Sequence, residues 1–286
     1  MGGPRVAAMA NTVLSGSVRS PAASPGPRDS RARVVLDWAA SSDAGTCRNH
    51  NEDSWRVLEE HGLMVLADGM GGYSAGEVAS AIAVDGVCAH VSDDPGAGGA
   101  ADPCAELRRA ISAANAAILA AAARRPECLG MGTTLVAAWV VGRRLHHAHV
   151  GDSRAYLLRE GVLLRLTSDH SMRQAMVDAG VVGADSTRRA AFRGVLTRAL
   201  GVESLVQADA GTVELEPGDR LLLCSDGLTD LVDDARIRAV LAGPDGCAAQ
   251  ARQLVAHALE AGGHDNVTAI VARPADAEAS LLLGRA

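Results

Sequence analysis

The feature that most constrains the fold is a set of apolar runs of strand length that are joined by very short turns. The segments 54–69, 131–152 and 153–167 each contain two such runs, separated by two or three residues. Connections this short join antiparallel neighbours, because two parallel strands need a crossover of about a dozen residues or more. We therefore expect three hairpins, the first of them with His61 and Gly62 as its turn.

Apolar residues at helical spacing occur in pairs of segments that do not alternate with single strands. The first pair is 75–91 with 102–125, and the second is 233–243 with 246–262. A shorter helix is expected at 170–180, and further strands are expected at 33–42, 207–215, 218–226 and 266–274. Strand runs with paired helices favour a layered fold with antiparallel sheets. They argue against the regular alternation of a doubly wound Rossmann sheet.

The composition allows a sizeable core but restricts what fills it. Apolar residues make up 48% of the 286 residues and aromatic residues only 2%, so the core must consist of Val, Leu, Ala and Ile. The net charge of −7 gives no support to nucleic-acid binding. No run of 18 apolar residues occurs, so we expect neither a transmembrane helix nor a membrane partner.

The six cysteines form no CxxC pair, and several lie inside apolar runs. We interpret them as buried, reduced thiols of a cytoplasmic protein. The alternative is a secreted disulfide framework, which would need a signal peptide. The first 14 residues contain too weak an apolar region for one.

Local composition also divides the chain into segments. Residues 1–31 are rich in Pro, Ser, Gly, Ala and Arg without periodicity, which is typical of a disordered leader. Residues 32–274 carry the predicted elements and are expected to form one domain, and 275–286 form a short tail. Within the domain, 181–195 is polar and irregular, which indicates a flap.

Acidic residues recur at the ends of the predicted strands. Asp68, Asp152, Asp226 and Asp265 each lie at a terminus of an apolar strand, and Asp53 lies at the start of another. Any one of them could be an ordinary turn residue. If two sheets bring these ends together, the carboxylates would repel one another unless a cation held them. Oxygen ligands suit Mg²⁺ or Mn²⁺ better than zinc.

The glycine-rich turn after Asp68 could serve a nucleotide or a metal. Its spacing departs from the GxGxxG nucleotide fingerprint, because Ser74 stands at the position of the third glycine. Small neighbours instead let a backbone carbonyl reach a cation. Gly69 is therefore a candidate ligand through its C=O group.

A centre of two metal ions would suit a substrate that carries a phosphate group. Two such ions at about 3.5–4 Å can activate a bridging water for in-line attack on phosphorus. A further cation must then hold the remaining phosphate oxygens. Arg48 precedes Asp53 by five residues, and a guanidinium binds phosphate in bidentate fashion. The alternative for Arg48 is an ordinary surface arginine.

Eight segments together resemble the metal-dependent Ser/Thr protein phosphatases of the PPM family (type 2C), in their compact bacterial form. They occur in the family's order. The segments are 41–55, 66–80, 130–140, 148–161, 166–171, 196–201, 218–232 and 262–272. The ordered series makes the resemblance far more specific than any single motif.

The resemblance implies an α+β fold, a four-layer α-β-β-α sandwich in which helix pairs flank a central antiparallel β-sandwich. It implies that 32–274 is a catalytic domain that hydrolyses phosphoserine and phosphothreonine with two Mn²⁺ or Mg²⁺ ions. The partners would be phosphoproteins, including substrates of a Ser/Thr kinase, and we expect a monomer. The alternative is a catalytically inactive PPM-like domain that regulates partners or binds phosphoproteins. Such domains usually lose metal carboxylates, and this chain retains them.

The resemblance also assigns roles position by position. Asp68 matches the carboxylate that bridges the two metals and orients the bridging water, and Gly69 matches the backbone-carbonyl ligand. Asp226 and Asp265 match the other principal metal carboxylates.

Three further positions match less central parts of the family's site. Asp53 matches an acidic residue tied to the second metal, mostly through water, and Asp152 matches the carboxylate at a third metal in bacterial members. Arg48 matches the phosphate-binding arginine. The segment 181–195 matches the variable flap beside the active site, where Arg188, Arg189 and Arg193 either attract acidic phosphopeptides or form a solvated surface.

Met70 stands where many eukaryotic members carry a histidine that is proposed as general acid. Methionine cannot donate a proton, and we expect metal-bound water to be the source instead. His170, His264 and the group at 146, 147 and 149 are expected to have structural or hydrogen-bonding roles. A strand would place His147 and His149 on one face and His146 on the other.

Overall fold

The computed structural model describes residues 12–17, 36–71, 75–93, 102–181, 192 and 194–274. In this part of the chain, the strands form two six-stranded antiparallel sheets. The first sheet has the order β1 (Thr12–Ser17), β2 (Leu36–Asp43), β12 (Val267–Pro274), β11 (Arg220–Cys224), β8 (Arg154–Arg159) and β9 (Val162–Arg165). The second has the order β10 (Asp209–Glu214), β7 (Arg144–Val150), β6 (Leu135–Val141), β4 (Leu63–Met70) and β3 (Asp53–Leu58), with β5 (Gly132–Thr133) paired to β4.

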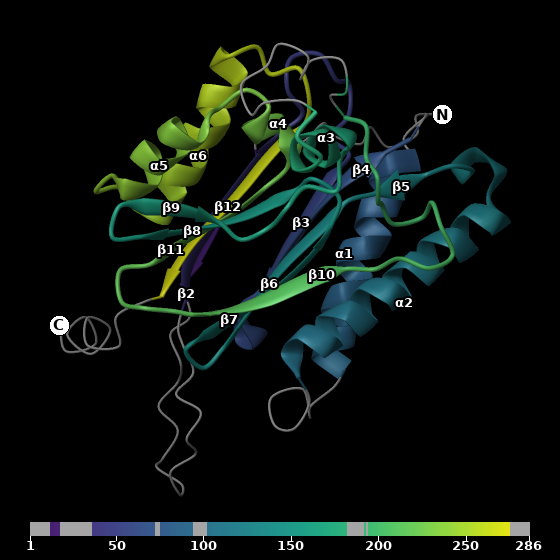
Figure 1. Cartoon of the computed structure of the whole chain (residues 1–286), viewed down its shortest axis with the longest axis horizontal. Helices are drawn as coiled ribbons and strands as arrows, with labels where there is room; N and C mark the ends of the chain where they lie inside the picture. The colour runs from purple at the N-terminus through teal and green to yellow at the C-terminus, as the bar shows by residue number, and fades with distance from the viewer. Residues whose placement is uncertain are drawn as a thin grey trace, which may run out of the picture.

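Helices cover the outer faces of both sheets (Figure 1). On the second sheet lie α1 (Ala75–Asp93) and α2 (Pro103–Arg124), and on the first lie α5 (Asp234–Ala242) and α6 (Cys247–Glu260). The short helices are α3 (Met172–Asp178), α4 (Asp226–Thr229) and the 3-10 turns Glu59–His61 and Pro126–Cys128. The predicted four-layer α-β-β-α sandwich is confirmed.

Strand β4 shows why the sequence folds into these layers. Leu63, Val65 and Ala67 pack in the cluster that contains α1 and α2, whereas Met64 and Leu66 pack between the two sheets. Both faces are buried, so the strand is a nearly continuous apolar run. Alternation then places the next even-numbered side chain, Asp68, on the inter-sheet face at the end of the strand.

The hairpin turns differ from one another. Between β8 and β9, Glu160 (φ 49°) and Gly161 (φ 77°) form the predicted two-residue turn with both φ angles positive, as a type I′ turn requires. Between β3 and β4 the prediction of a His61-Gly62 turn is wrong, because a 3-10 turn at Glu59–His61 extends the connection. Gly62 follows at φ 67°, and a Cβ there would lie 2.7 Å from the carbonyl oxygen of Val140.

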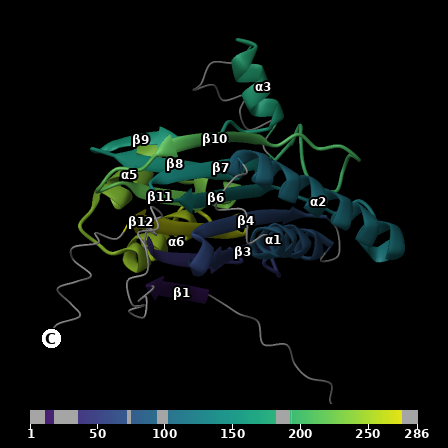
Figure 2. The same cartoon turned by 90° about the horizontal axis from the view of Figure 1, so that it is seen from below.

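The leader was predicted to be disordered throughout, and this is wrong for one segment. Thr12–Ser17 forms β1, which pairs antiparallel with β2 along the edge of the first sheet (Figure 2). Such an edge strand needs backbone partners rather than alternating apolar residues, so its sequence carries little signal. The remainder of 1–31, the tail 275–286 and most of the flap, including Arg188, Arg189 and Arg193, lie outside the described residues.

All six cysteines are free: Cys47 is exposed and the other five are buried. The prediction of thiols without disulfide partners is therefore confirmed at all six positions, and the prediction of burial is confirmed at five and is wrong for Cys47. In the described part of the chain, no helix has the length and apolar character needed to cross a membrane.

Candidate metal centre

The predicted acidic residues come together at one end of the β-sandwich. Asp68, Asp152, Asp226 and Asp265 line one pocket of about 190 Å³, together with Arg48. This pocket opens where the inter-sheet faces of the strands change from apolar to polar side chains. The predicted convergence of strand ends is thus present in the structure.

Asp53 joins this group from the neighbouring strand. It lies directly opposite Asp68 in the register of β3 and β4. Its Oδ2 atom accepts hydrogen bonds from Ser225 Oγ (2.8 Å) and Thr268 Oγ1 (2.6 Å). Its Oδ1 atom is buried and has no hydrogen-bond partner among the described residues. A buried carboxylate oxygen without a donor is costly, so this atom fits a site that holds a cation.

Burial and mutual repulsion act on four of these carboxyl groups, those of Asp53, Asp68, Asp152 and Asp226. Desolvation, followed by the charges of Asp53 and Asp226, raises the pKa of Asp68 well above its usual value. Desolvation likewise raises the pKa of Asp53 to about 7 and that of Asp152 to about 8, and it raises the pKa of Asp226. The pocket therefore disfavours several ionised carboxylates together unless positive charge is supplied.

Threonines on the β5–β6 segment fix the main chain of Asp68. The Asp68 N–H donates to Thr134 Oγ1 at 3.0 Å, and the Asp68 carbonyl accepts from Thr133 Oγ1 at 2.8 Å. Thr134 Oγ1 also lies 2.7 Å from Ser153 Oγ, next to Asp152. One threonine side chain thus connects the two strand ends that carry Asp68 and Asp152.

Gly69 allows a close approach of three backbone segments. A Cβ at this position would lie 2.2 Å from the carbonyl oxygen of Gly76 and 2.7 Å from that of Glu52. The Gly69 N–H also donates to the Glu52 carbonyl at 3.1 Å. Only glycine fits there, so the start of α1 can pack directly against the end of β4.

Arg48 lies at the rim of the same pocket. Its Nη2 atom is 2.8 Å from Asp265 Oδ2, and its side chain is 53% exposed. The hydrogen bond to Asp265 is the main reason that the pKa of Arg48 is raised. The guanidinium is thus charged, accessible and adjacent to the carboxylates, as a phosphate-binding group must be.

Asn266 holds the loop that carries Arg48, and it was not among the predicted site residues. Its Nδ2 group donates to the carbonyls of Ala44 and His50, both at 2.9 Å, and its Oδ1 atom accepts from the Glu52 N–H at 2.7 Å. Asn266 is 4% exposed. Its position directly after Asp265 was the available signal, as was that of Ser225 directly before Asp226.

The histidines have hydrogen-bonding roles, as predicted for His146, His149 and His170. His146 Nδ1 lies 2.9 Å from Thr212 Oγ1, and His149 Nε2 lies 2.8 Å from the Ser168 carbonyl oxygen. His170 Nδ1 accepts from the Gly151 N–H at 3.2 Å, and its ring stacks on His149.

A group of possible metal ligands, His149, His170 and Asp209, lies near these contacts. Asp209 is already paired with the Arg198 guanidinium at 3.0 Å. That arginine supplies a positive charge where an ion would lie, so we assign no metal there.

The model of the protein phosphatase 2C family matches residues 47–261. This chain belongs to that family. Among curated relatives, the serine/threonine protein phosphatase PstP of Mycobacterium tuberculosis is 43% identical over 246 residues, which are 86% of this chain and 46% of PstP. The serine/threonine phosphatase stp of Listeria monocytogenes is 36% identical over 233 residues, which are 80% of this chain and 92% of the relative.

Solved structures of bacterial serine/threonine phosphatases match most of this chain. The catalytic domain of PstP in complex with two manganese ions is 42% identical, with a TM-score of 0.76, and the match covers 85% of this chain and 100% of that one. Stp1 from Staphylococcus aureus is 33% identical, with a TM-score of 0.80, and the match covers 88% and 100%. This chain spans about half the length of full PstP and nearly all of the Listeria protein.

Proposed function

We propose that this protein is a serine/threonine phosphoprotein phosphatase that works with two divalent cations, Mn²⁺ or Mg²⁺. The observation that carries the proposal is the pocket of converging carboxylates, together with the unpartnered Oδ1 atom of Asp53, which lies opposite Asp68 in the strand register. Support comes from relatives that are named as such phosphatases and from the two manganese ions in the PstP complex. The substrates would be proteins phosphorylated by Ser/Thr kinases.

The donor set of the pocket fits hard cations, because every candidate ligand is an oxygen atom. Asp68 would help to hold both ions, with the Gly69 carbonyl, Asp226 and Asp265 as further ligands. Asp53 would support the second ion, and Asp152 would hold a third where one is bound. When present, such ions supply positive charge for the phosphate oxygens and activate water for attack on phosphorus.

The residues of the chain would bind and orient the phosphate monoester. Arg48 would exchange its contact with Asp265 for the phosphate oxygens, where a bidentate guanidinium contact gains most from the shared geometry. Asn266 would keep the Arg48 loop in place. Met70 also lines the pocket but has no proton to donate, so no side chain at that position protonates the leaving hydroxyl group.

The test is release of phosphate from a phosphothreonine peptide with Mn²⁺, with Mg²⁺ or with chelator. We expect release only with metal, together with a metal-dependent rise of the melting temperature. Asp226→Asn should lose most of the activity and most of the melting shift. Asp245→Asn, an exposed carboxylate in the loop before α6, is the matched control and should keep both. Folded wild-type protein that binds metal without releasing phosphate would instead support the inactive, phosphoprotein-binding alternative.

A further inference from the structure

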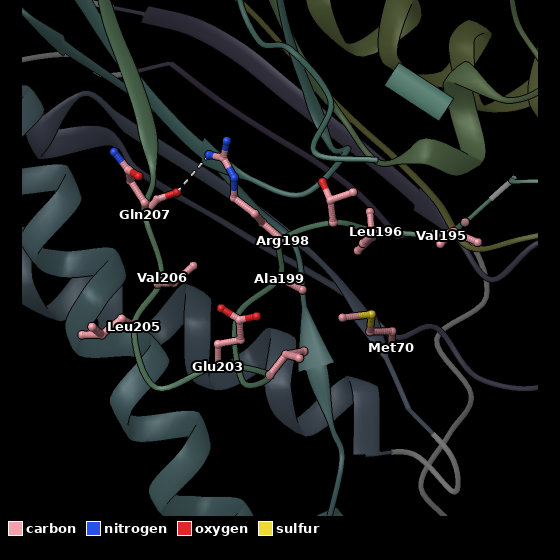
Figure 3. A pocket seen from close by; sticks show the side chains of 12 residues that line it. Met70, Val195, Leu196, Arg198, Ala199, Glu203, Leu205, Val206 and Gln207 are labelled. Atoms are coloured by element: carbon pink, nitrogen blue, oxygen red, sulfur yellow. Dashed lines mark hydrogen bonds between the residues drawn. The ribbon is translucent and has the colours of Figure 1, made fainter. Parts of the chain in front are cut away.

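A second and larger cavity adjoins the metal pocket (Figure 3). Its volume is about 750 Å³. Its walls are the end of β4, the segment that follows the flap, and the loop that leads to β10. The lining residues are Met70, 194–199, Val202, Glu203 and 205–207. We call this cavity the side groove.

The side groove and the metal pocket share a wall. Met70, Gly194 and Leu196 line both cavities. A Cβ placed on Gly132 would lie 2.7 Å from Met70 Cε and 3.4 Å from Val202 Cγ2, so both side chains lie beside Gly132. Met70 thus forms an apolar partition between the carboxylates and the groove.

The groove exposes apolar side chains that a folded protein would ordinarily bury. Val195 is 43% exposed, Val202 is 62% exposed and Leu205 is 85% exposed. The arginine of its rim, Arg198, is already engaged by Asp209 and by the carbonyl of Gln207. These apolar side chains line one cavity together with a few polar groups, which is the lining that ligand-binding sites usually have.

The loop that contains Val202 and Leu205 is hydrogen-bonded to side chains of α2. Asn115, which is 1% exposed, accepts from the Gly201 N–H at 2.7 Å and donates to the Glu203 carbonyl at 2.9 Å. Arg108 Nε donates to the Ala208 carbonyl at 3.3 Å. These bonds anchor both ends of the loop, so its apolar side chains are presented on a preformed support.

We propose that the side groove binds an apolar side chain of the phosphoprotein substrate, one to three residues from the phosphorylated residue. The proposal rests on the proposed phosphatase function and names its specificity. The metal pocket, at about 190 Å³, is smaller than the roughly 300–1,000 Å³ of ordinary ligand pockets. Any polypeptide whose phosphate enters it must continue outside it, and the side groove is the cavity with which it shares Met70 and Leu196.

An extended substrate advances about 3.3–3.6 Å per residue, and alternate side chains point the same way. One flanking position should therefore enter the groove while its neighbours do not. Burial of a Leu side chain contributes enough free energy for a change of about tenfold in kcat/KM relative to Ala.

The experiment measures kcat/KM with Mn²⁺ for phosphothreonine peptides in which each of the three flanking positions on either side is Leu, Ala or Glu. We expect one position to prefer Leu over Ala by about tenfold and to disfavour Glu. Equal rates at every position would overturn the proposal. p-Nitrophenyl phosphate, which has no polypeptide, reports on the chemistry alone. If the metal-loaded protein hydrolyses neither this compound nor the peptides, the proposed function fails. Calorimetric binding of the same peptides then shows whether the groove prefers Leu at one position.

Two variants with matched controls locate the preference. Val202→Asp and Leu205→Asp should reduce the Leu-to-Ala ratio of kcat/KM to about one. The controls Val162→Asp and Leu129→Asp change residues of similar exposure, 57% and 80%, that do not line the groove, and they should keep the ratio. Because each ratio compares two peptides on one protein, a general loss of activity or stability cancels. A ratio that survives both groove variants would contradict the proposal.

Discussion

Asp53 and Asp68 lie directly opposite each other on adjacent antiparallel strands, with both carboxylates on the inter-sheet face of the sandwich. Like charges in such a cross-strand pair destabilise a sheet. Asp226 and Asp152 add further negative charge around Asp68. The sheet therefore gains stability when a cation enters this pocket, and the first two predictions follow from that gain.

Metal binding should stabilise the fold, and more so at higher pH. Ligand at 100 times its Kd adds about 2.7 kcal/mol to the free energy of unfolding. Asp53 and Asp152, with pKa values of about 7 and about 8 without metal, must lose protons when the ion binds. The melting shift with Mn²⁺ should therefore grow from pH 6 to pH 8, as measured by calorimetry. A shift that shrinks over this range would contradict the assignment.

Asp53→Asn should stabilise the metal-free protein at pH 8 and weaken its response to metal. Because the pKa of Asp53 is raised in the folded state, the native protein binds more protons than the unfolded chain, and wild-type stability falls as pH rises from about 4 to about 8. The amide removes this loss and keeps an acceptor for Ser225. We expect a gain of about 1–3 kcal/mol in chelator at pH 8, from urea unfolding. Equal stability of variant and wild type at pH 8 would show that the ionised Asp53 carboxylate does not destabilise the metal-free protein.

Gly69→Ala should destabilise the protein by about 1–3 kcal/mol or more, because its Cβ would lie 2.2 Å from the Gly76 carbonyl oxygen. Gly86→Ala is the matched control. It lies within α1, and its Cβ would meet Ala114 Cβ at an ordinary 3.4 Å. There, alanine should be neutral or stabilise by about 0.5–1 kcal/mol. Similar effects of the two substitutions on urea unfolding would refute the close approach at Gly69.

Asn266→Ala should remove the support of the Arg48 loop. It removes three hydrogen bonds to partly buried backbone groups, and a typical hydrogen bond contributes about 0.5–1.5 kcal/mol to the free energy of unfolding. KM for the phosphopeptide should rise more than kcat falls, since the proposed role of Arg48 is to bind phosphate rather than to take part in bond breaking. Asn266→Asp, which keeps the acceptor for Glu52, should lie between alanine and wild type. If it behaves like alanine, the acceptor contact contributes little.

Met70→His would introduce a titrating group beside the metal pocket. An unperturbed histidine has a pKa of about 6.5, so the pH–rate profile of phosphate release should gain an inflection between about pH 6 and 7. Arg143→His, on the turn between β6 and β7, controls for a histidine elsewhere and should leave the profile unchanged. An unchanged profile in Met70→His would show that position 70 does not influence proton transfer.

The layers and the acidic strand ends were predictable because they depend on local patterns. The side chains of β4 alternate between two buried faces, which is enough to place Asp68 at the strand end between the sheets. Short turns such as Glu160-Gly161 determine which strands pair. The resemblance to the phosphatase family then assigned a role to each carboxylate.

Other features depend on contacts between distant segments and leave no local pattern. Asn266 reaches carbonyls more than 200 positions away in the sequence. The edge strand β1 pairs through its backbone, so a segment without periodicity still forms a strand. The side groove is built from apolar residues, such as Val202 and Leu205, that resemble core residues until their exposure is known.

The most direct test of the central claim is a calorimetric titration of the metal-free protein with Mn²⁺ at pH 8. We expect two ions to bind per chain, with a weaker third where Asp152 takes part. Asp226→Asn should lose at least one of the two, whereas Asp245→Asn should keep both. Fewer than two ions in the wild type, or the same binding in Asp226→Asn, would contradict the dinuclear centre.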